Sequence, residues 1–367
     1  MENTTPNTDN FLNWVKIENF KSIKDLEFNC RRVNVFIGKP NVGKSNILEG
    51  LGLLGAEYGK SKFVNGFVRY RDVKNLFYDN DVTKSVTIQS DRQIVGLYAG
   101  GVETDSEMDY NYFLADLADV KKHIEQRNLE LLEQLSAKKR YVISRNGEYE
   151  VWNTDATDRR NNISSVKKYD FDNLTEFENL FHGFLLPPNG INLYEIVKRR
   201  DDIATEFIGL FKEQNLEFIF DERRQTFLLQ RKKGPRVFQD EFFSIADTFR
   251  RFMFYITAIE SNKNSVIIFE EPEVHSFPPY TQDIAYRMIY SEENQFFVST
   301  HSPYLLQTLV SNLKDDQLNV FVTYYENYET KVKALTAEEL SFVQEYSTDV
   351  FFNLDRFVPN AQSANPA

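Results

Sequence analysis

Short apolar runs, rich in β-branched and aromatic residues, occur along this chain at 33–37, 266–269 and 296–298. Apolar runs of this length predict strands that are buried in a sheet. Residues 45–57 instead place apolar side chains at helical spacing, namely Ile47, Leu48, Leu51 and Leu54. This spacing predicts a helix directly after the first strand. The pattern therefore predicts an α/β protein with a strand-turn-helix unit near its N-terminal end.

A second helical pattern begins after residue 105. Apolar side chains recur at intervals of three, four or seven, at Phe113, Leu117, Val120, Ile124, Leu131 and Leu135. Ser106 and Asp109 resemble a capping box at its start. The pattern predicts a helix to about Lys138, roughly 50 Å long at 1.5 Å per residue. No second half of similar strength follows, which favours a compact helical insert over a long rod.

The turn between the first strand and its helix carries the most informative motif, Gly-x-x-x-x-Gly-Lys-Ser at residues 38–45. In a phosphate-binding loop the glycines turn backbone N–H groups toward the phosphates, the lysine reaches the β- and γ-phosphates, and the serine hydroxyl reaches Mg²⁺. The strand before the loop and the helix after it supply the context that this chemistry needs. We predict that the nucleotide is bound by Gly38, Lys39, Pro40, Asn41, Val42, Gly43, Lys44, Ser45 and Asn46.

The same loop sequence occurs in GTPases, so the loop alone does not distinguish ATP from GTP. None of the glycines follows an aspartate by three residues, as a γ-phosphate-sensing Asp-x-x-Gly would require. The segment closest to a guanine-binding motif is Leu313-Lys314-Asp315-Asp316, and leucine lacks the amide of asparagine. The sequence therefore favours ATP over GTP.

Two acids directly follow the second apolar run, at Glu270 and Glu271. Acids at the carboxyl end of a buried strand suit a Walker B element, in which one carboxylate holds Mg²⁺ and the next polarises a water molecule. We predict Glu270, in place of the usual aspartate, for the metal and Glu271 as general base. The alternative is a strand that simply ends in solvated acids.

Glu271 lies 227 residues after Lys44, so a subdomain must separate the two halves of the site. This layout resembles the ABC-type ATPase heads of the SMC, RecF and OLD proteins. The segment Asn19-Phe20-Lys21-Ser22 is similar to their opening strand, and Thr300-His301-Ser302-Pro303 is similar to the switch-histidine strand of the OLD-like branch. The resemblance implies a P-loop ABC-type core with a mixed, mainly parallel sheet flanked by helices. It also implies that Lys21 and Ser22 border the nucleotide and that His301 senses the γ-phosphate.

The segment from Ser244 to Arg251 stands where this family carries its signature helix start. It has no glycine, so its backbone approaches a phosphate less closely. We predict that Ser244 and Asp247 cap this helix and face a nucleotide held by a second protomer. An ordinary capped core helix is the alternative. No counterpart of the family's Q-loop glutamine is evident, although Gln89 and Gln93 are candidates.

The resemblance implies an ATPase that uses ATP and Mg²⁺ and associates head to tail, as a dimer or larger oligomer. Fewer than seventy residues follow the histidine strand, too few for the Toprim nuclease domain of OLD proteins. Stand-alone heads of this kind are often encoded beside a toxin or nuclease in bacterial anti-phage systems, which suggests a regulator of a separate effector. The alternatives are an ATP-gated scaffold with little turnover and a RecF-like DNA-repair ATPase.

Composition modifies this picture in a few respects. The net charge of −12 argues against a surface built throughout for nucleic acid. Local basic groups at 138–140, 199–200, 223–224 and 231–233 would permit DNA contact if several shared one face. No apolar run approaches the roughly 18 residues of a membrane helix, there is no signal-peptide pattern, and the single cysteine excludes a disulfide framework. A cytoplasmic protein is expected.

We predict that residues 1–105 and 240–358 form the two parts of the ATPase core. Residues 106–239 would form a helical or mixed insert between them, and 359–367 a disordered tail.

Overall fold

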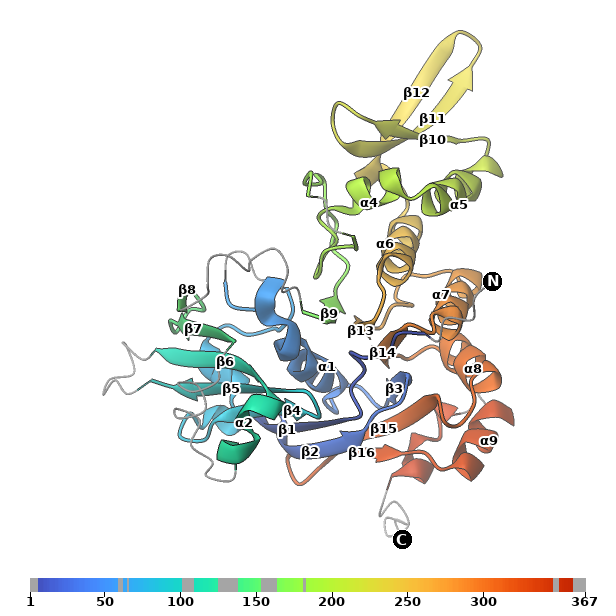
Figure 1. Ribbon diagram of the computed structural model, residues 1–367. Helices are drawn as coiled ribbons and strands as arrows, with labels where there is room; N and C mark the ends of the chain where they lie inside the picture. Colours follow the sequence, from blue (N-terminus) through green and yellow to red (C-terminus); the bar gives the residue numbers. More distant parts are fainter. Residues whose placement is uncertain are drawn as a thin grey trace.

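The computed structural model describes residues 6–58, 62–64, 66–100, 109–124, 138–152, 164–180, 183–345 and 350–358. Its strands form a seven-stranded, a six-stranded and a three-stranded sheet. Figure 1 shows the two larger sheets in the body of the molecule and the smallest sheet projecting away from it.

The six-stranded sheet contains all three strands predicted from the apolar runs. Its order is β16-β15-β3-β14-β13-β9. All neighbouring strands are parallel except β15 and β16. The strands are β3 (Val33–Ile37), β9 (Val166–Tyr169), β13 (Ser265–Glu270), β14 (Asn294–Ser299), β15 (Leu318–Glu326) and β16 (Glu329–Ala334). A mixed, mainly parallel sheet is therefore confirmed.

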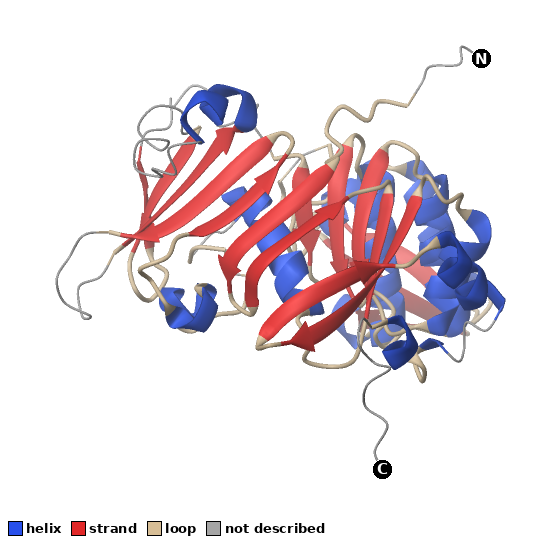
Figure 2. Cartoon of the chain, turned by 90° about the horizontal axis from the view of Figure 1, so that it is seen from below, coloured by secondary structure: helices blue, strands red, loops and turns tan. Residues whose placement is uncertain are grey.

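The seven-stranded sheet is antiparallel throughout and has the order β2-β1-β4-β5-β6-β7-β8. Its strands are β1 (Trp14–Phe20), β2 (Ile23–Asn29), β4 (Val86–Ser90), β5 (Gln93–Ala99), β6 (Tyr110–Asp116), β7 (Lys139–Ile143) and β8 (Tyr149–Trp152). In Figure 2 this sheet extends to one side of the molecule, whereas most helices gather at the other.

Helices cover both faces of the six-stranded sheet. On one face α1 (Lys44–Gly52) contacts β9, β13 and β14, and also β1 of the other large sheet. On the opposite face pack α6 (Asp247–Ser261), α7 (Pro278–Tyr290) and α8 (Pro303–Asn312), followed by α9 (Ala337–Glu345). Short 3₁₀ segments are η1 (Leu53–Tyr58), η2 (Val73–Leu76), η3 (Tyr78–Asn80), η4 (Phe242–Ser244) and η5 (Leu354–Phe357).

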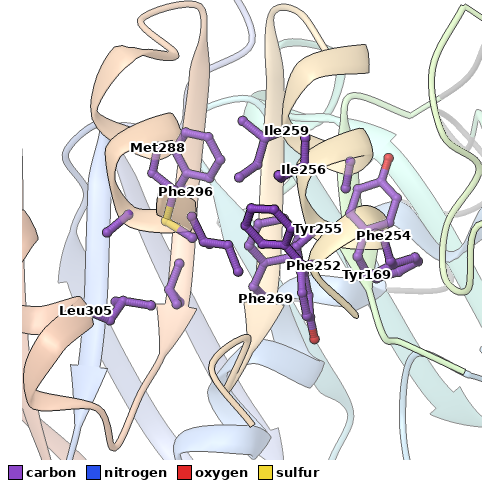
Figure 3. Close-up of a cluster of buried hydrophobic side chains, with 14 of the residues drawn as sticks. Tyr169, Phe252, Phe254, Tyr255, Ile256, Ile259, Phe269, Met288, Phe296 and Leu305 are labelled. Atoms are coloured by element: carbon purple, nitrogen blue, oxygen red, sulfur yellow. The ribbon is translucent and has the colours of Figure 1, made fainter. Parts of the chain in front are cut away.

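The strand residues alternate between two hydrophobic cores. Ile267 and Phe269 of β13 belong to the core under α6–α8, whereas Val266 and Ile268 belong to the core that includes α1. All four are fully buried, as a strand covered by helices on both faces requires. Figure 3 shows the first core, in which aromatic side chains of α6 pack over β13 and β14 beside Met288 and Leu305.

The three-stranded sheet is antiparallel, with the order β10 (Glu217–Asp221), β11 (Thr226–Lys233) and β12 (Arg236–Glu241). Helices α4 (Leu193–Arg199) and α5 (Asp201–Lys212) lie beneath it in Figure 1. Phe218 and Phe227 are buried against this pair of helices, and Phe211 of α5 stacks on Phe218 with ring centroids 5.6 Å apart. An aromatic cluster thus attaches this sheet to the body.

The prediction of a long helix from about 106 to 138 is wrong where the structure describes that segment. Tyr110–Asp116 forms strand β6, and only Leu117–Ile124 is helical (α2). Tyr110, Tyr112 and Leu114 face one core while Phe113 and Ala115 face another, so burial on both faces of a strand produced apparent helical spacing. Ser106 and residues 125–137 lie outside the described residues. The proposed domain boundaries stay predictions, although 106–239 contains strands β6–β12 and is mixed rather than largely helical.

After β14 the chain continues through helix α8, strands β15 and β16 and helix α9. The predicted tail at 359–367 lies outside the described residues. In the part of the chain that the structure describes, no helix has the length and apolarity needed to cross a membrane.

Candidate functional site

The glycine-rich loop joins β3 to α1, with Gly43 as the residue that precedes the helix. Gly43 has φ 97°, and a Cβ added there would collide with the Thr330 hydroxyl. A Cβ at Gly38 would collide with the Thr323 carbonyl oxygen on β15. Only glycine satisfies both the backbone angle at Gly43 and these close approaches. The loop is therefore shaped by its contacts with β15 and β16 as well as by its own sequence.

A cavity of about 490 Å³ opens over this loop. The chain contributes to it from the loop, from the ends of β13 and β14, and from more distant segments. The lining residues are Ser22, Pro40, Asn41, Val42, Gly43, Lys44, Ser45, Asn46, Arg69, Glu270, Glu271, His301 and Tyr325. The structure thus brings together the predicted loop, both predicted acids and the predicted histidine.

Lys44 is the buried cation of the cavity. Its Nζ donates hydrogen bonds to the carbonyl oxygens of Gly38, at 2.9 Å, and Lys39, at 3.0 Å. Burial lowers the pKa of Lys44, although the carboxylates of Glu271, Glu270 and Glu273 oppose this shift. A desolvated ammonium held by two carbonyls is placed to exchange them for anionic oxygens.

Glu271 and His301 face each other across two adjacent strand ends. Strands β13 and β14 are paired so that Glu270 lies beside Ser299, and the Glu271 N–H donates to the Ser299 carbonyl at 3.0 Å. The Glu271 carboxylate then lies 3.3 Å from His301 Nε2. Glu271 has φ 45°, a left-handed conformation that costs a non-glycine residue about 1–3 kcal/mol and is common at functional sites.

Burial lowers the pKa of the His301 imidazole, and the nearby Lys44 ammonium lowers it further, with Glu271 opposing. The ring is 39% exposed and is tilted toward Phe351, with centroids 6.3 Å apart. Near neutral pH the imidazole is therefore uncharged and can exchange a proton with a neighbour.

Glu273 is a residue that the sequence analysis did not assign. Its Oε1 accepts hydrogen bonds from the Thr300 hydroxyl and the His301 N–H, both at 2.7 Å. Burial raises the pKa of this carboxyl group, and among the described residues its buried Oε2 has no hydrogen-bond donor. Glu273 therefore fixes the turn that carries His301. Glu273 is the third acid of the run Glu-Glu-Pro-Glu at 270–273, but no neighbouring residue indicated which groups would donate hydrogen bonds to it.

Glu270 is held by two cations from distant segments. Arg69 Nη2 lies 3.3 Å from one carboxylate oxygen and Lys168 Nζ lies 3.7 Å from the other. Lys168, on β9, is 2% exposed. A second cavity of about 520 Å³ lies on this side and is also lined by Arg69, Lys168 and Glu270. Neither cation was predicted, because no motif surrounds them.

Lys21 and Ser22 have different surroundings. The Lys21 ammonium pairs with the buried carboxylate of Glu49 and donates to the Arg69 carbonyl at 2.6 Å. It does not line the cavity over the loop, in contrast to Ser22. Ser22 Oγ accepts from Asn46 Nδ2 at 2.6 Å and lies 2.7 Å from the Thr330 hydroxyl. Lys21 thus organises Glu49 and Arg69 behind the site.

Lys39 directs its ammonium to Asp355, at 2.7 Å, so only its carbonyl contacts Lys44. Gln89 and Gln93 lie on β4 and β5 of the seven-stranded sheet and do not line the cavity. Neither glutamine is therefore supported as the Q-loop residue.

The predicted caps of α6 are wrong. Ala246 precedes the helix without a side-chain cap, Ser244 belongs to η4, and Asp247 is the first helical residue. The Asp247 carboxylate instead contacts Arg251 at 2.7 Å and His275 at 3.0 Å. The start of α6 is thereby tied to the loop that follows Glu271. Neither Ser244 nor Asp247 lines the cavity over the loop.

Comparison with protein families gives a match over residues 11–226, which include the loop and Lys168, to the AAA ATPase domain. This match covers more than half of the chain. The chain belongs to the AAA ATPase domain family.

One curated relative, the uncharacterized protein MJECL10 of Methanocaldococcus jannaschii, is 33% identical over 86 residues. The matched segment covers 20% of this chain and 39% of that protein. The chain therefore spans well under half of this relative.

Among solved structures, the chain is similar to an SMC head bound to the C-terminal winged-helix domain of ScpA. The identity is 13%, the TM-score 0.48, and 90% of this chain and 99% of that one are covered. An SMC head from Thermotoga maritima gives 12% identity and a TM-score of 0.40, with 89% and 99% covered. An SMC head with an extended coiled coil from Pyrococcus furiosus gives 12% and 0.46, with 92% and 99% covered.

The donors around the cavity fit Mg²⁺ bound together with a nucleotide. The Ser45 hydroxyl and the Glu270 carboxylate both line it, and they are the hard oxygen ligands that Mg²⁺ prefers. Across the described residues, no three His, Cys, Asp or Glu side chains cluster as a metal cage. Few protein ligands suit an ion that keeps several waters and binds substrate phosphates.

Proposed function

We propose that this AAA ATPase domain protein hydrolyses ATP with Mg²⁺, using a site completed by a second copy of the chain. The observation that carries the proposal is the pair Glu271 and His301, 3.3 Å apart, which lines the loop cavity together with Lys44. A carboxylate and a neutral imidazole in contact suit the activation of a water molecule.

In this mechanism each group acts mainly by position and charge. Backbone N–H groups of the loop and the Lys44 ammonium hold the β- and γ-phosphates. Ser45 and Glu270 would hold Mg²⁺, which would supply positive charge to neutralise the developing charge on the phosphates. Glu271 accepts the proton of the attacking water, and His301 responds to the γ-phosphate. Glu273 keeps His301 in place through the backbone hydrogen bond of 2.7 Å.

The first test is phosphate release by the purified protein and by Lys44→Ala. Removal of the buried ammonium should reduce turnover by at least about a hundredfold, the usual effect of deleting one preorganised charge contact. A matched control is Lys39→Ala, because the Lys39 ammonium is directed to Asp355. Unchanged turnover in Lys44→Ala would show that ATP is not hydrolysed in this cavity.

The second test concerns self-association. Ser244 and Asp247, at the start of α6, do not line the cavity of their own chain. We propose that this start of α6 closes the cavity of another copy, head to tail. Glu271→Gln should bind ATP without cleaving it and elute as a larger species on size exclusion. A monomer saturated with ATP would contradict the composite site.

A second candidate function is an ATP-gated scaffold with little turnover. The contacts of Glu270 with Arg69 and Lys168 favour it, because a carboxylate held by two cations is less available to a metal. ATP-dependent assembly of the wild-type protein without phosphate release would support the scaffold.

We further propose that the ATP-bound assembly acts on a separately encoded effector, as in the anti-phage systems whose stand-alone heads the sequence resembles. Copurification with the product of the neighbouring gene, with and without ATP, tests this partner. A RecF-like role in DNA repair would instead require turnover that DNA stimulates.

A further inference from the structure

Strands β11 and β12 form a hairpin that projects beyond the rest of the molecule (Figure 1). The turn is Gly234-Pro235, with Gly234 at φ 57°. Every residue of β12, Arg236–Glu241, is exposed. The base of the hairpin is anchored by buried Phe227 and Leu229, whereas its tip has no covering element among the described residues.

Strand register sorts the side chains of the tip onto two faces. Arg231 pairs with Phe238 and Lys233 with Arg236. Directly opposite residues and those two positions along a strand share a face. These four residues, here called the hairpin patch, therefore combine three cations with one aromatic ring. Asp240, opposite Leu229, is the next residue of the same face toward the base of the hairpin, so the patch keeps an excess of positive charge. Lys232 belongs to the other face, where it pairs with Glu217 at 3.3 Å.

The hairpin patch is arranged in a way that folding alone does not favour. Lys233 and Arg236 are directly opposite, and like charges in that position destabilise a hairpin. Across the described residues, no carboxylate lies within ion-pair distance of either one. The chain as a whole carries a net charge of −12. A local excess of cations at the most projecting point is thus suited to an anionic partner.

Phe238 indicates which class of anionic molecule fits the hairpin patch. Its ring is 40% exposed, and the Arg231 guanidinium lies 5.3 Å from the ring centroid. An exposed aromatic ring beside cations is the combination that binds unpaired nucleotides, since a base stacks on the ring while phosphates contact the cations. A paired duplex would leave the ring without a base to stack on.

We propose that the hairpin patch is a binding site for single-stranded nucleic acid. Arg231, Lys233 and Arg236 neutralise successive phosphates, and Phe238 stacks on one base. Because the site lies on the projecting sheet, it does not depend on the proposed hydrolysis of ATP.

The test uses the full chain and a fluorescein-labelled oligothymidine of about 12 nucleotides, within the range of small single-strand modules. Fluorescence anisotropy is measured without ATP at several salt concentrations. Neutralisation of three phosphates predicts a slope of log K against log salt of about −2. Oligouridine binding with the same residue dependence would equally support the proposal. An absence of binding at low salt would overturn it.

Variants assign the binding to the hairpin patch. The triple variant Arg231→Gln, Lys233→Gln, Arg236→Gln should weaken binding by at least about tenfold and flatten the salt dependence. Phe238→Ala should weaken it by about tenfold with the salt dependence unchanged. Lys232→Gln, on the other face, is the matched control and should bind like wild type. Thermal unfolding and ATP binding of each variant check the fold.

Two results would contradict the assignment. Equal binding by the triple variant would place the site elsewhere, and tighter binding of a duplex of equal length would exclude stacking on Phe238.

Discussion

The carboxyl end of the six-stranded sheet and the projecting three-stranded sheet both gather charged side chains, but they do so under opposite conditions. At the first, Glu271 and Glu273 follow β13, a strand buried on both faces, and Lys44 begins the helix that follows buried β3. At the second, Lys233 and Arg236 extend from a hairpin whose outer strand is exposed throughout. The first region resembles the interior of a protein and the second its outer surface.

This difference determines what each region can do. Burial makes charge interactions strong and shifts the pKa of Lys44, Glu273 and His301, which suits bond making and breaking. Exposure leaves the charges of the hairpin accessible to solvent and screened by salt, which suits reversible contact with a polyanion. The two regions should therefore respond very differently to matched substitutions.

The largest contrast is expected for loss of a phenylalanine side chain. Phe269, on β13, is fully buried, so Phe269→Ala should lower the free energy of unfolding by about 3–5 kcal/mol. Phe238→Ala on the hairpin should change it by at most about 0.5 kcal/mol. Urea unfolding of both variants measures the difference. Similar losses would mean that the hairpin contributes to the core.

A smaller contrast compares Lys168, which is buried beside Glu270, with Lys232 on the exposed hairpin. Lys168→Met removes a buried cation from Glu270, so the carboxylate should become more available to a metal. The Mg²⁺ concentration for half-maximal binding of a fluorescent ATP analogue should fall by about tenfold, equivalent to about 1.4 kcal/mol. Lys232→Met on the hairpin is the control and should leave this concentration unchanged. An unchanged Mg²⁺ requirement in Lys168→Met would show that Glu270 is not restrained.

The smallest effect is the titration of His301. Because burial and Lys44 lower its pKa below 6.5, the folded protein binds this proton only at lower pH than the unfolded chain does. The contribution of the uncharged His301 imidazole to the free energy of unfolding is complete above pH 6.5. It is lost as the pH falls through the pKa of His301 in the folded protein. Proton NMR of the imidazole ring, assigned with His301→Gln, should give a midpoint below 6.5.

Lys44→Ala should move that midpoint upward, because it removes the neighbouring positive charge. A midpoint at or above 6.5 in the wild-type protein would contradict the burial of the ring.

Local chemistry made several features predictable. Three buried strands, the helix after the loop and the loop itself follow from contiguous residues, because apolar runs and glycine positions act over a few residues. The parallel pairing of β13 and β14 then carries Glu271 and His301 to the same edge of the sheet. The roles of these residues in hydrolysis stay predictions.

The long-helix prediction failed for a physical reason. In β6 both faces of the strand are buried, so apolar residues occupy successive positions and mimic helical spacing. Periodicity measures burial rather than backbone shape when an element has no solvent face. The strands of the projecting sheet were missed because their tip residues are charged on both faces.

By itself, then, the sequence determined the phosphate-binding loop, the strands that flank it and the acids that follow a buried strand, since each depends on neighbouring residues. Only the tertiary structure decided that Arg69 and Lys168 hold Glu270, that Glu273 fixes His301, and that three cations share a strand face with Phe238. These contacts join residues that strand order and register place side by side. Pairing of this kind is settled by the packing of the whole chain, and no short segment encodes it.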